Sequence, residues 1–365
     1  MQFAVGQVRW FHEFAPHLGA SNLLSSAIAL IEQRHPGIIP DLRKHQTILI
    51  GSDYGGCHRA AEFEVASFLV TNLESIGAWN AARSRLRKAG LPQNRRMSYK
   101  ALGDHHRKKA LMPFLETADH ITGLLISIAV DRTISSLFEG ERTGEERAIL
   151  REVFNGWKPE PIERAMRIMH FAGLILRGIS RGGQDVWWFT DQDEVVANQA
   201  RLRTFVSTMA TISSHYLPHQ LRQLRIGTTA CDTANHDLED YLAVPDLAAG
   251  ALQELLSNGD ARLLLDTPSL FLPNCQTGAP KARCIMNWFS DITQNLRRVT
   301  LVMDEPVLGK PRITTFRAHG SREQDAPRYA QVAESDRSVF TEHQSAQSPR
   351  QRKISTKEQS YGKML

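Results

Sequence analysis

The segment TILIGSDYGG at residues 47–56 decides the fold that we expect for this chain. Its first half is a run of β-branched and apolar residues, which predicts a buried strand, and the Tyr-Gly-Gly that ends it is a turn signal. A second apolar run, FEVASFLVTN at residues 63–72, predicts a neighbouring strand that is antiparallel if the intervening loop is a hairpin. Asp53 therefore falls at the carboxyl end of a buried strand.

Strands and helices alternate along the chain after this pair. The apolar patterns predict buried strands at residues 121–130, 185–190 and 224–229, and helices at residues 74–88, 107–118, 144–178, 195–216 and 246–256. We place the start of the last helix at Asp246 because Pro245 precedes it, and proline is favoured at the first position of a helix. This order predicts an α/β protein with a mixed sheet and flanking helices.

We divide the chain into four parts by composition. They are an N-terminal helical segment at residues 1–46, a core at 47–257, an elaboration packed on the core at 258–309, and a basic tail at 310–365. The first part contains an amphipathic helix at residues 21–34. The tail has few large apolar residues, so we expect it to be disordered and to offer a basic surface to a protein partner.

The composition excludes several classes of protein. With 365 residues, 42% hydrophobic and 23% charged, the chain has the profile of a globular protein. Its apolar runs are shorter than the roughly 20 residues of a membrane-spanning helix, and Arg9, His12 and Glu13 interrupt the N-terminus where a secretory signal would be apolar. We expect a cytoplasmic protein without a membrane partner. Four scattered cysteines without a Cys-x-x-Cys pair exclude a disulfide framework and a structural zinc motif.

Charge is segregated along the chain. Residues 310–365 contain eleven basic and six acidic residues, which accounts for the whole net charge of +5. Within the rest, residues 83–109 contain ten Lys or Arg and one acid, whereas residues 232–246 contain five acids and no Lys or Arg. A basic stretch of this kind predicts contact with phosphates, and an acidic stretch predicts a hard cation.

Three aspartates stand where ligand sites form in α/β sheets. Asp53 and Asp191 each follow a buried strand, and Asp246 begins the helix after the last core strand. Carboxylates gathered at one sheet edge repel one another, so a cation must compensate them. Mg²⁺ or Mn²⁺ is the natural candidate, and two such ions about 4 Å apart would stabilise the attacking and leaving oxygens of phosphodiester hydrolysis.

The order of these elements resembles the RNase H-like superfamily, which has an Asp on its first strand, an antiparallel partner strand, a later strand ending in Asp and a final helix with an acid. More narrowly, residues 47–256 are similar to the bacterial family catalogued as domain of unknown function 3800. That family has an Asp-Glu-Ser-Gly strand end, an acid-x-Lys element and a final Ala-Asp-Leu-x-x-Gly. The matching stretches here are Asp53-Tyr54-Gly55-Gly56, Met97-Ser98-Tyr99-Lys100 and residues 245–251, with Tyr54 and Ser98 where the family has carboxylates.

The resemblance implies an RNase H-like mixed sheet and a two-metal nuclease that cleaves DNA or RNA. Asp53, Asp191 and Asp246 would hold Mg²⁺ or Mn²⁺, and Lys100 would neutralise developing charge. Glu74, Asp193 or Glu194 beside Asp191, and Glu239 are candidates to replace the missing carboxylates, and we select Asp193 and Glu239 as further metal ligands. The residues expected to contact nucleic-acid phosphates are Arg95, Arg96, Lys100, Arg107, Lys108 and Lys109.

Other interpretations of the same residues stay open. Asp53 could be a turn residue, Asp191 could cap the following helix, and Asp246 could interact with the dipole of its helix. The basic stretch could be the solvated face of a helix. Two further functions compete with the nuclease. One is an RNase H-like nucleic-acid-binding or assembly subunit with an incomplete acidic set. The other is a haloacid dehalogenase-type phosphatase, because Asp191-Gln192-Asp193 matches that class's Asp-x-Asp opening.

Overall fold

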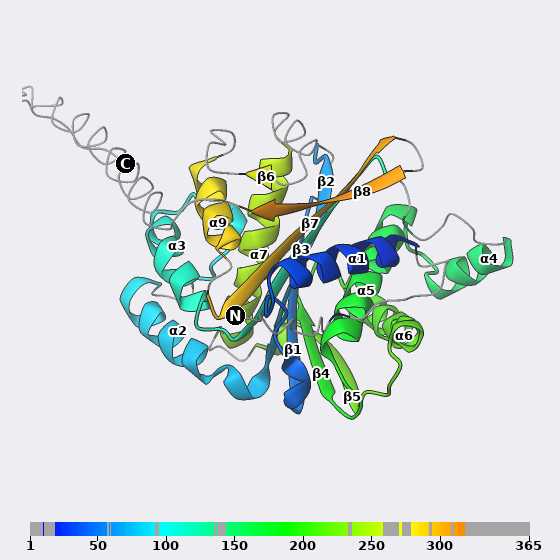
Figure 1. Ribbon diagram of the computed structural model, residues 1–365, viewed down its shortest axis with the longest axis horizontal. Coiled ribbons are helices and arrows are strands. Elements are labelled where there is room, and N and C mark those ends of the chain that lie inside the picture. Colours follow the sequence, from blue (N-terminus) through cyan, green and yellow to red (C-terminus); the bar gives the residue numbers. More distant parts are fainter. Residues whose placement is uncertain are drawn as a thin grey trace, which may run out of the picture. The chain divides into compact units, whose positions relative to one another are not determined.

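The computed structural model describes residues 10, 19–56, 58, 60–91, 95–134, 137, 144–232, 236–257, 270–271, 279–291, 294–307 and 310–317. All of them belong to one compact unit, Met1–Arg322. A mixed β-sheet runs through this unit, with helices on both of its faces (Figure 1). The α/β class that the sequence predicts is therefore confirmed.

The strands of the sheet are β1 (Thr47–Gly55), β2 (Phe63–Asn72), β3 (Gly123–Asp131), β4 (Asp185–Thr190), β5 (Gln223–Thr228), β6 (Leu270–Phe271), β7 (Leu296–Val307) and β8 (Lys310–Arg317). They lie in the order β5-β4-β1-β2-β3-β7-β8-β6. β2 is antiparallel to both of its neighbours, β1 and β3. β4 runs parallel to β1, β5 parallel to β4 and β7 parallel to β3. The carboxyl ends of β1, β4 and β5 therefore meet at one edge of the sheet.

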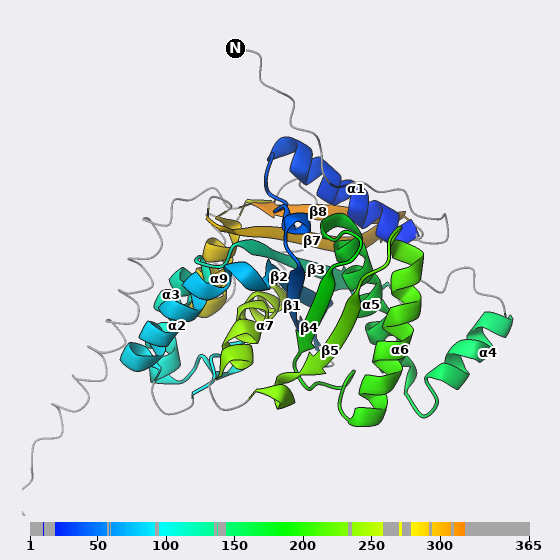
Figure 2. The same cartoon turned by 90° about the horizontal axis from the view of Figure 1, so that it is seen from below.

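The helices are α1 (Gly19–Arg34), α2 (Gly77–Gly90), α3 (His105–Ala118), α4 (Gly144–Val153), α5 (Pro159–Ile179), α6 (Gln199–Tyr216), α7 (Asp237–Leu256) and α9 (Pro280–Ser290), and a short 3₁₀ turn, η4, spans Tyr99–Ala101. Figure 2 shows α5 and α7 on opposite sides of the sheet. α1, α5 and α6 enclose the larger apolar core, which includes Ile48 and Ile50 of β1. In the described part of the chain, no helix combines the length and apolarity that crossing a bilayer requires.

Successive side chains of β1 point alternately to the two helix layers that cover the sheet. Ile48 and Ile50 face the α5 layer, whereas a Cβ atom on Gly51 would lie 2.6 Å from the Tyr241 ring of α7. Side chains two residues apart share a face of a strand, so Asp53 also points to the α7 side. β1 extends to Gly55, two residues beyond the predicted end, so Asp53 lies inside the strand and its interpretation as a turn residue is wrong.

The start of α7 corrects one prediction. The helix begins at Asp237, and both Pro245 and Asp246 lie in its interior. Asp237, Glu239 and Asp240 occupy the first turn, where carboxylates interact favourably with the helix dipole. Burial of the following turns against β1 and β2 compensates for the amide hydrogen that proline lacks. Asp246 is therefore not a partner of the helix dipole.

The boundary of the basic tail is also corrected. We expected disorder from residue 310, but Lys310–Arg317 forms β8 and pairs antiparallel with β7. Arg312 pairs with Asp304 of β7, and the buried Thr314 anchors the strand. The elaboration at residues 258–309 also supplies β7, which joins the sheet directly beside β3. Residues 318–365 lie outside the described residues.

Candidate acidic active site

Asp53 lies opposite the middle of α7. On the same face of β1, a Cβ on Gly51 would meet Tyr241, and one on Gly55 would meet the Ala249 carbonyl at 3.1 Å. Asp53 lies between Gly51 and Gly55 on the strand, and Asp246 lies between Tyr241 and Ala249 on the helix. The two carboxyl groups repel each other electrostatically. The close approach of strand and helix, which two glycines permit, thus brings together acids from distant parts of the sequence.

Asp246 is bound by the segment before α3. Its Oδ2 accepts a hydrogen bond from the Tyr99 amide at 2.9 Å, and the Ser98 side chain also hydrogen-bonds to it. The Tyr99 ring lies against Gly250, where a Cβ would come within 2.4 Å of it, and the Tyr99 hydroxyl donates to Glu254 at 2.6 Å. The two short motifs of the sequence, at residues 97–100 and 245–251, are therefore in direct contact.

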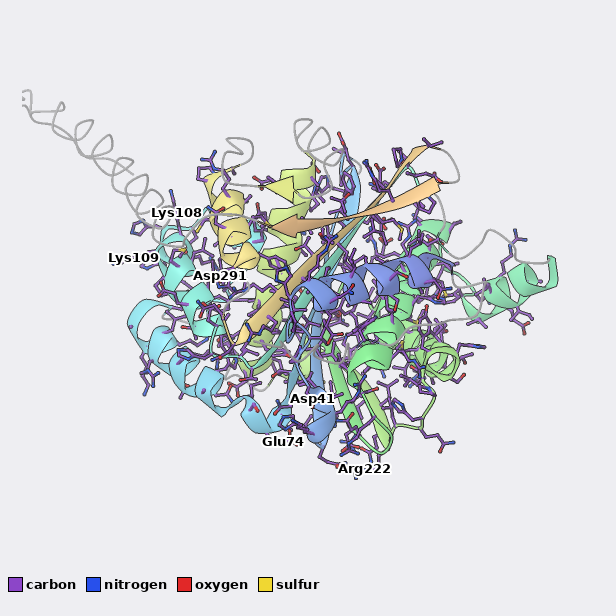
Figure 3. All side chains as sticks on the ribbon, viewed as in Figure 1. Asp41, Glu74, Lys108, Lys109, Arg222 and Asp291 are labelled. Carbon is purple, nitrogen blue, oxygen red and sulfur yellow. The ribbon has the colours of Figure 1, made fainter. Side chains whose placement is uncertain are left out.

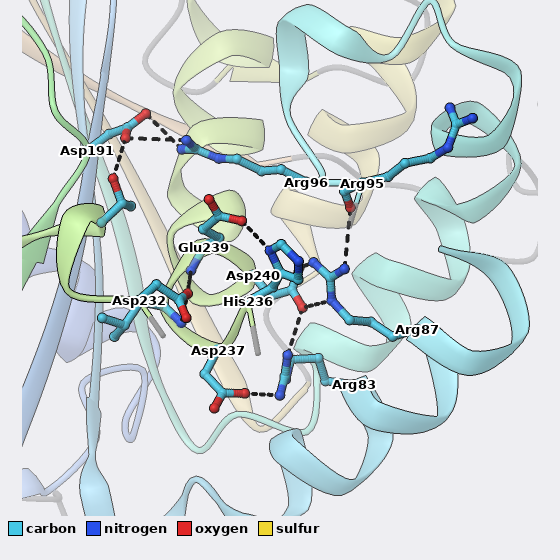
Figure 4. Close-up of polar contacts among 12 residues, drawn as sticks. Arg83, Arg87, Arg95, Arg96, Asp191, Asp232, His236, Asp237, Glu239 and Asp240 are labelled. Atoms are coloured by element: carbon cyan, nitrogen blue, oxygen red, sulfur yellow. Dashed lines mark hydrogen bonds and ion pairs between the residues drawn. The ribbon is translucent and has the colours of Figure 1, made fainter. Parts of the chain in front are cut away.

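Asp191 follows β4 and faces an arginine (Figure 4). Arg96 donates to Oδ2 from Nη2 at 2.7 Å and to Oδ1 from Nη1 at 3.3 Å. The Thr229 hydroxyl at 3.1 Å and the Gln192 amide at 2.9 Å complete its bonding. The N-cap interpretation of Asp191 is wrong, because α6 begins later and Asn198 is its N-cap.

We call Asp53, Asp191 and Asp246 the acidic cluster. Burial, and then the charges of Asp246 and Asp191, raise the pKa of Asp53 well above its usual value. Burial also raises the pKa of Asp246. Burial opposes ionisation of Asp191 as well, but the hydrogen bonds and charge of Arg96 outweigh it and lower that pKa. Within the described residues of the cluster, three carboxyl groups face the guanidinium of Arg96, so its single positive charge is smaller than the negative charge of the fully ionised cluster.

The chemistry of this cluster suits a hard divalent cation. Carboxylate oxygens are the preferred protein ligands of Mg²⁺, which is commonly held by one or two carboxylates together with water and substrate phosphates. Among the described residues, however, no group of three His, Cys, Asp or Glu side chains has the arrangement to hold a metal ion. The donors and the excess of negative charge fit the ion, while Arg96 occupies the oxygens of Asp191.

The two further candidate ligands are engaged differently. Asp193 accepts hydrogen bonds from the amides of Val195 and Val196 through Oδ1, and its buried Oδ2 has no hydrogen-bond partner. Burial raises the pKa of Asp193, and the charge of the nearby Asp191 adds to that effect. Glu239 pairs with His236 at the start of α7. Asp193 therefore borders the acidic cluster, whereas the contact of Glu239 is local to its own helix.

At least five of the ten cations of the basic stretch, all of them arginines, pair with carboxylates of the protein. Arg83 and Arg87 of α2 bind Asp240, and Arg83 also binds Asp237 (Figure 4). We call these four residues the paired cluster. Its members were not among the predicted functional residues. The opposite charges of residues 83–109 and 232–246, which we interpreted as signs of phosphate and cation binding, are the signal that could have indicated this contact.

The remaining cations divide into two groups. Arg95 and Arg107 both pair with Asp104, the N-cap of α3. Lys100 and Lys109 are exposed, and Lys108 is half-buried. Figure 3 shows Lys108 and Lys109 on α3 at the left of the view, apart from Glu74 at its lower edge. Of the six predicted phosphate contacts, Lys100 and Lys109 are thus the most accessible.

Comparison with known proteins adds no assignment. A scan against profiles of known protein families finds no match, and a search of curated proteins finds none either. The function must therefore be inferred from the residues of the site.

Proposed function

We propose that this chain is an RNase H-like nuclease that uses Mg²⁺ or Mn²⁺ to hydrolyse phosphodiester bonds of DNA or RNA at the acidic cluster. One observation carries the proposal. The negative charges of Asp246 and Asp191 act on the Asp53 carboxyl, and Arg96 is a cation whose charge reaches all three. The mutual repulsion of these carboxylates does not stabilise the fold, so their arrangement points to a ligand that relieves the repulsion.

The topology supports the RNase H-like part of the proposal. β1 carries the first aspartate, β2 is its antiparallel partner, β4 ends next to the second aspartate, and α7 carries the third. This is the order of elements on which the resemblance rests.

The residues of the chain have separable roles in such a reaction. Bound metal would activate water and stabilise the leaving oxygen. Asp53 and Asp246 supply oxygens from β1 and α7, elements held by packing, so the site is preorganised. Arg96 keeps Asp191 ionised and presents a fork that also matches a phosphate. Lys100, exposed beside Tyr99, adds positive charge where the polyanion arrives.

A second function is favoured by a specific observation. Arg96 on Asp191 and Ser98 on Asp246 satisfy two of the three carboxylates without a metal. The chain would then be an RNase H-like nucleic-acid-binding or assembly subunit without catalysis. The phosphatase alternative gains no support, because Asp193 uses a carboxylate oxygen to bind backbone amides.

A melting experiment with and without Mn²⁺ separates these functions. At about a hundredfold excess of Mn²⁺ over its Kd, the wild type should gain about 2.7 kcal/mol of stability. Asp53→Asn should lose this gain. Glu116→Gln, which removes one exposed acid from α3 outside the cluster, should keep it.

Cleavage of single- and double-stranded DNA and RNA is measured in the same buffers. We expect Mn²⁺-dependent cleavage by the wild type and by Glu116→Gln, and none by Asp53→Asn. A wild type that neither gains stability with Mn²⁺ nor cleaves any of the four substrates would instead support the binding subunit.

A further inference from the structure

Arg96 is the counter-ion of the acidic cluster. Both of its terminal nitrogens bind Asp191, and its charge also acts on Asp246 and Asp53. Arginine stays protonated at any physiological pH, so this compensation is permanent while the side chain stays in place. A divalent cation entering the cluster must therefore compete with Arg96 for Asp191.

Asp191 does not depend on Arg96 for its hydrogen bonds. The Thr229 hydroxyl and the Gln192 amide both donate to Oδ1, so this oxygen keeps two partners when the guanidinium leaves. Oδ2, at 2.7 Å from Arg96, is the oxygen that would be released. If the Arg96 side chain moved away, Oδ2 of Asp191 would become available to a metal ion, while the hydrogen bonds to Oδ1 would keep the carboxylate oriented.

The main chain at Arg96 is fixed while its side chain is accessible. Arg107 Nε donates to the Arg96 carbonyl at 2.7 Å, and Asp104 pairs with both Arg95 and Arg107. The side chains of Arg96 and Asp191 are 28% and 32% exposed. A phosphate can thus reach the guanidinium from solvent, and the side chain can turn without moving its backbone.

We infer that Arg96 is an exchangeable counter-ion, which holds Asp191 in the metal-free protein and transfers to a backbone phosphate of nucleic acid when a divalent metal binds. This inference rests on the proposed nuclease function. The planar fork of arginine matches a phosphate as well as a carboxylate, so the transfer replaces one bidentate pair by another. A phosphate that binds Arg96 frees Asp191 for the metal, and a metal that binds Asp191 frees Arg96 for the phosphate. Each ligand therefore raises the affinity for the other by the same factor.

Calorimetric titration with Mn²⁺ tests the competition without relying on activity. We compare the wild type with Arg96→Gln and with the control Arg85→Gln, which removes the same charge from an exposed residue of α2 in the same basic stretch. Arg96→Gln should bind Mn²⁺ about tenfold more tightly, and Arg85→Gln should stay within about twofold of the wild type. Melting curves check that each variant is folded.

A second titration tests the transfer. Thymidine and uridine 5′-monophosphates supply a phosphate but contain no phosphodiester bond to hydrolyse. Either nucleotide should tighten Mn²⁺ binding to the wild type by about fivefold or more, and this effect should be lost in Arg96→Gln and only partly retained in Arg96→Lys.

Two results would overturn the inference in different ways. If the wild type binds Mn²⁺ and Arg96→Gln binds it equally or more weakly, Arg96 is not a competitor, while the proposed nuclease stands. If none of the proteins binds Mn²⁺, the proposed function fails together with the inference.

Discussion

Helix α7 carries an acid of the paired cluster, Asp240, and one of the acidic cluster, Asp246, and the two clusters compensate their charges in opposite ways. In the paired cluster, Arg83 and Arg87 meet Asp237 and Asp240. In the acidic cluster, Arg96 faces three carboxyl groups. The ratio of cations to carboxylates, rather than the presence of either, therefore distinguishes a structural ion-pair network from a candidate site.

The same comparison explains the segregated charge of the sequence. The basic residues of α2 and the acidic residues at the start of α7 are partners, so much of the segregation serves the contact between these two helices. Only the part that includes Arg96 and Asp246 bears on a ligand. Three substitutions test this distinction.

The largest effect is expected from Asp240→Ala, which breaks the paired cluster. The Asp240 side chain is 1% exposed and pairs with both Arg83 and Arg87, so its loss removes negative charge from beside two largely buried cations, although Arg83 keeps Asp237. We expect a loss of about 3–5 kcal/mol in unfolding free energy, measured by urea denaturation. Asp237→Ala is the control, because that side chain is 53% exposed and should cost less than about 1 kcal/mol. Equal losses in both variants would contradict the ranking.

A smaller loss of stability is expected from Gly250→Ala, which acts on the acidic cluster indirectly, through Tyr99. The new methyl group would lie 2.4 Å from the Tyr99 ring, whose amide binds Asp246. Overpacking of this kind costs about 1–3 kcal/mol, seen as a lower melting temperature. Gly77→Ala in α2 is the control, because no atom lies within 4 Å of the added carbon and the melting temperature should not fall. An unchanged melting temperature in Gly250→Ala would show that Tyr99 moves freely.

The smallest effect, and one of opposite sign, is expected from Asp53→Asn in the absence of divalent ions. The folded-state pKa of Asp53 is raised, so the folded protein resists an ionisation that the unfolded chain undergoes near pH 4. The wild type therefore loses stability as pH rises from the unfolded-state pKa to the folded one, and the variant does not. The two should melt alike near pH 3.5, and the variant should be more stable by about 1 kcal/mol at pH 8. A variant that is less stable at both pH values would assign Asp53 a structural hydrogen bond.

Strands were predictable from the sequence because burial on both faces leaves a continuous apolar run. β2 and β4 have the predicted bounds, and the end of β4 gave the position of Asp191, whereas β1 continues two residues beyond its predicted end at Asp53. Pro245 predicts a helix that begins at Asp246, because proline is favoured at the first position of a helix. This predicted start is wrong, since α7 begins at Asp237. β8 was missed because a strand with many polar residues, KPRITTFR at residues 310–317, is defined by its pairing with β7 rather than by its own pattern.

The ion pairs were beyond prediction for a different reason. Arg83 and Asp240 are 157 residues apart, and nothing in local periodicity specifies which distant charges will meet. Arg96 illustrates the consequence. It was predicted as one of six phosphate contacts, whereas its place in the acidic cluster follows from the meeting of β4, α7 and the segment before α3.

Because α7 carries both Asp240 and Asp246, the paired and acidic clusters are completed by the same helix during synthesis. Asp53 leaves the ribosome 193 residues before Asp246, which corresponds to roughly 10–40 s at about 5–20 residues per second. Until α7 docks on β1 and β2, the nascent chain lacks the attraction of the paired cluster and the part of the acidic cluster's repulsion that comes from Asp246. Docking brings both at once, so the ion pairs with Arg83 and Arg87 favour the step that the carboxylates oppose.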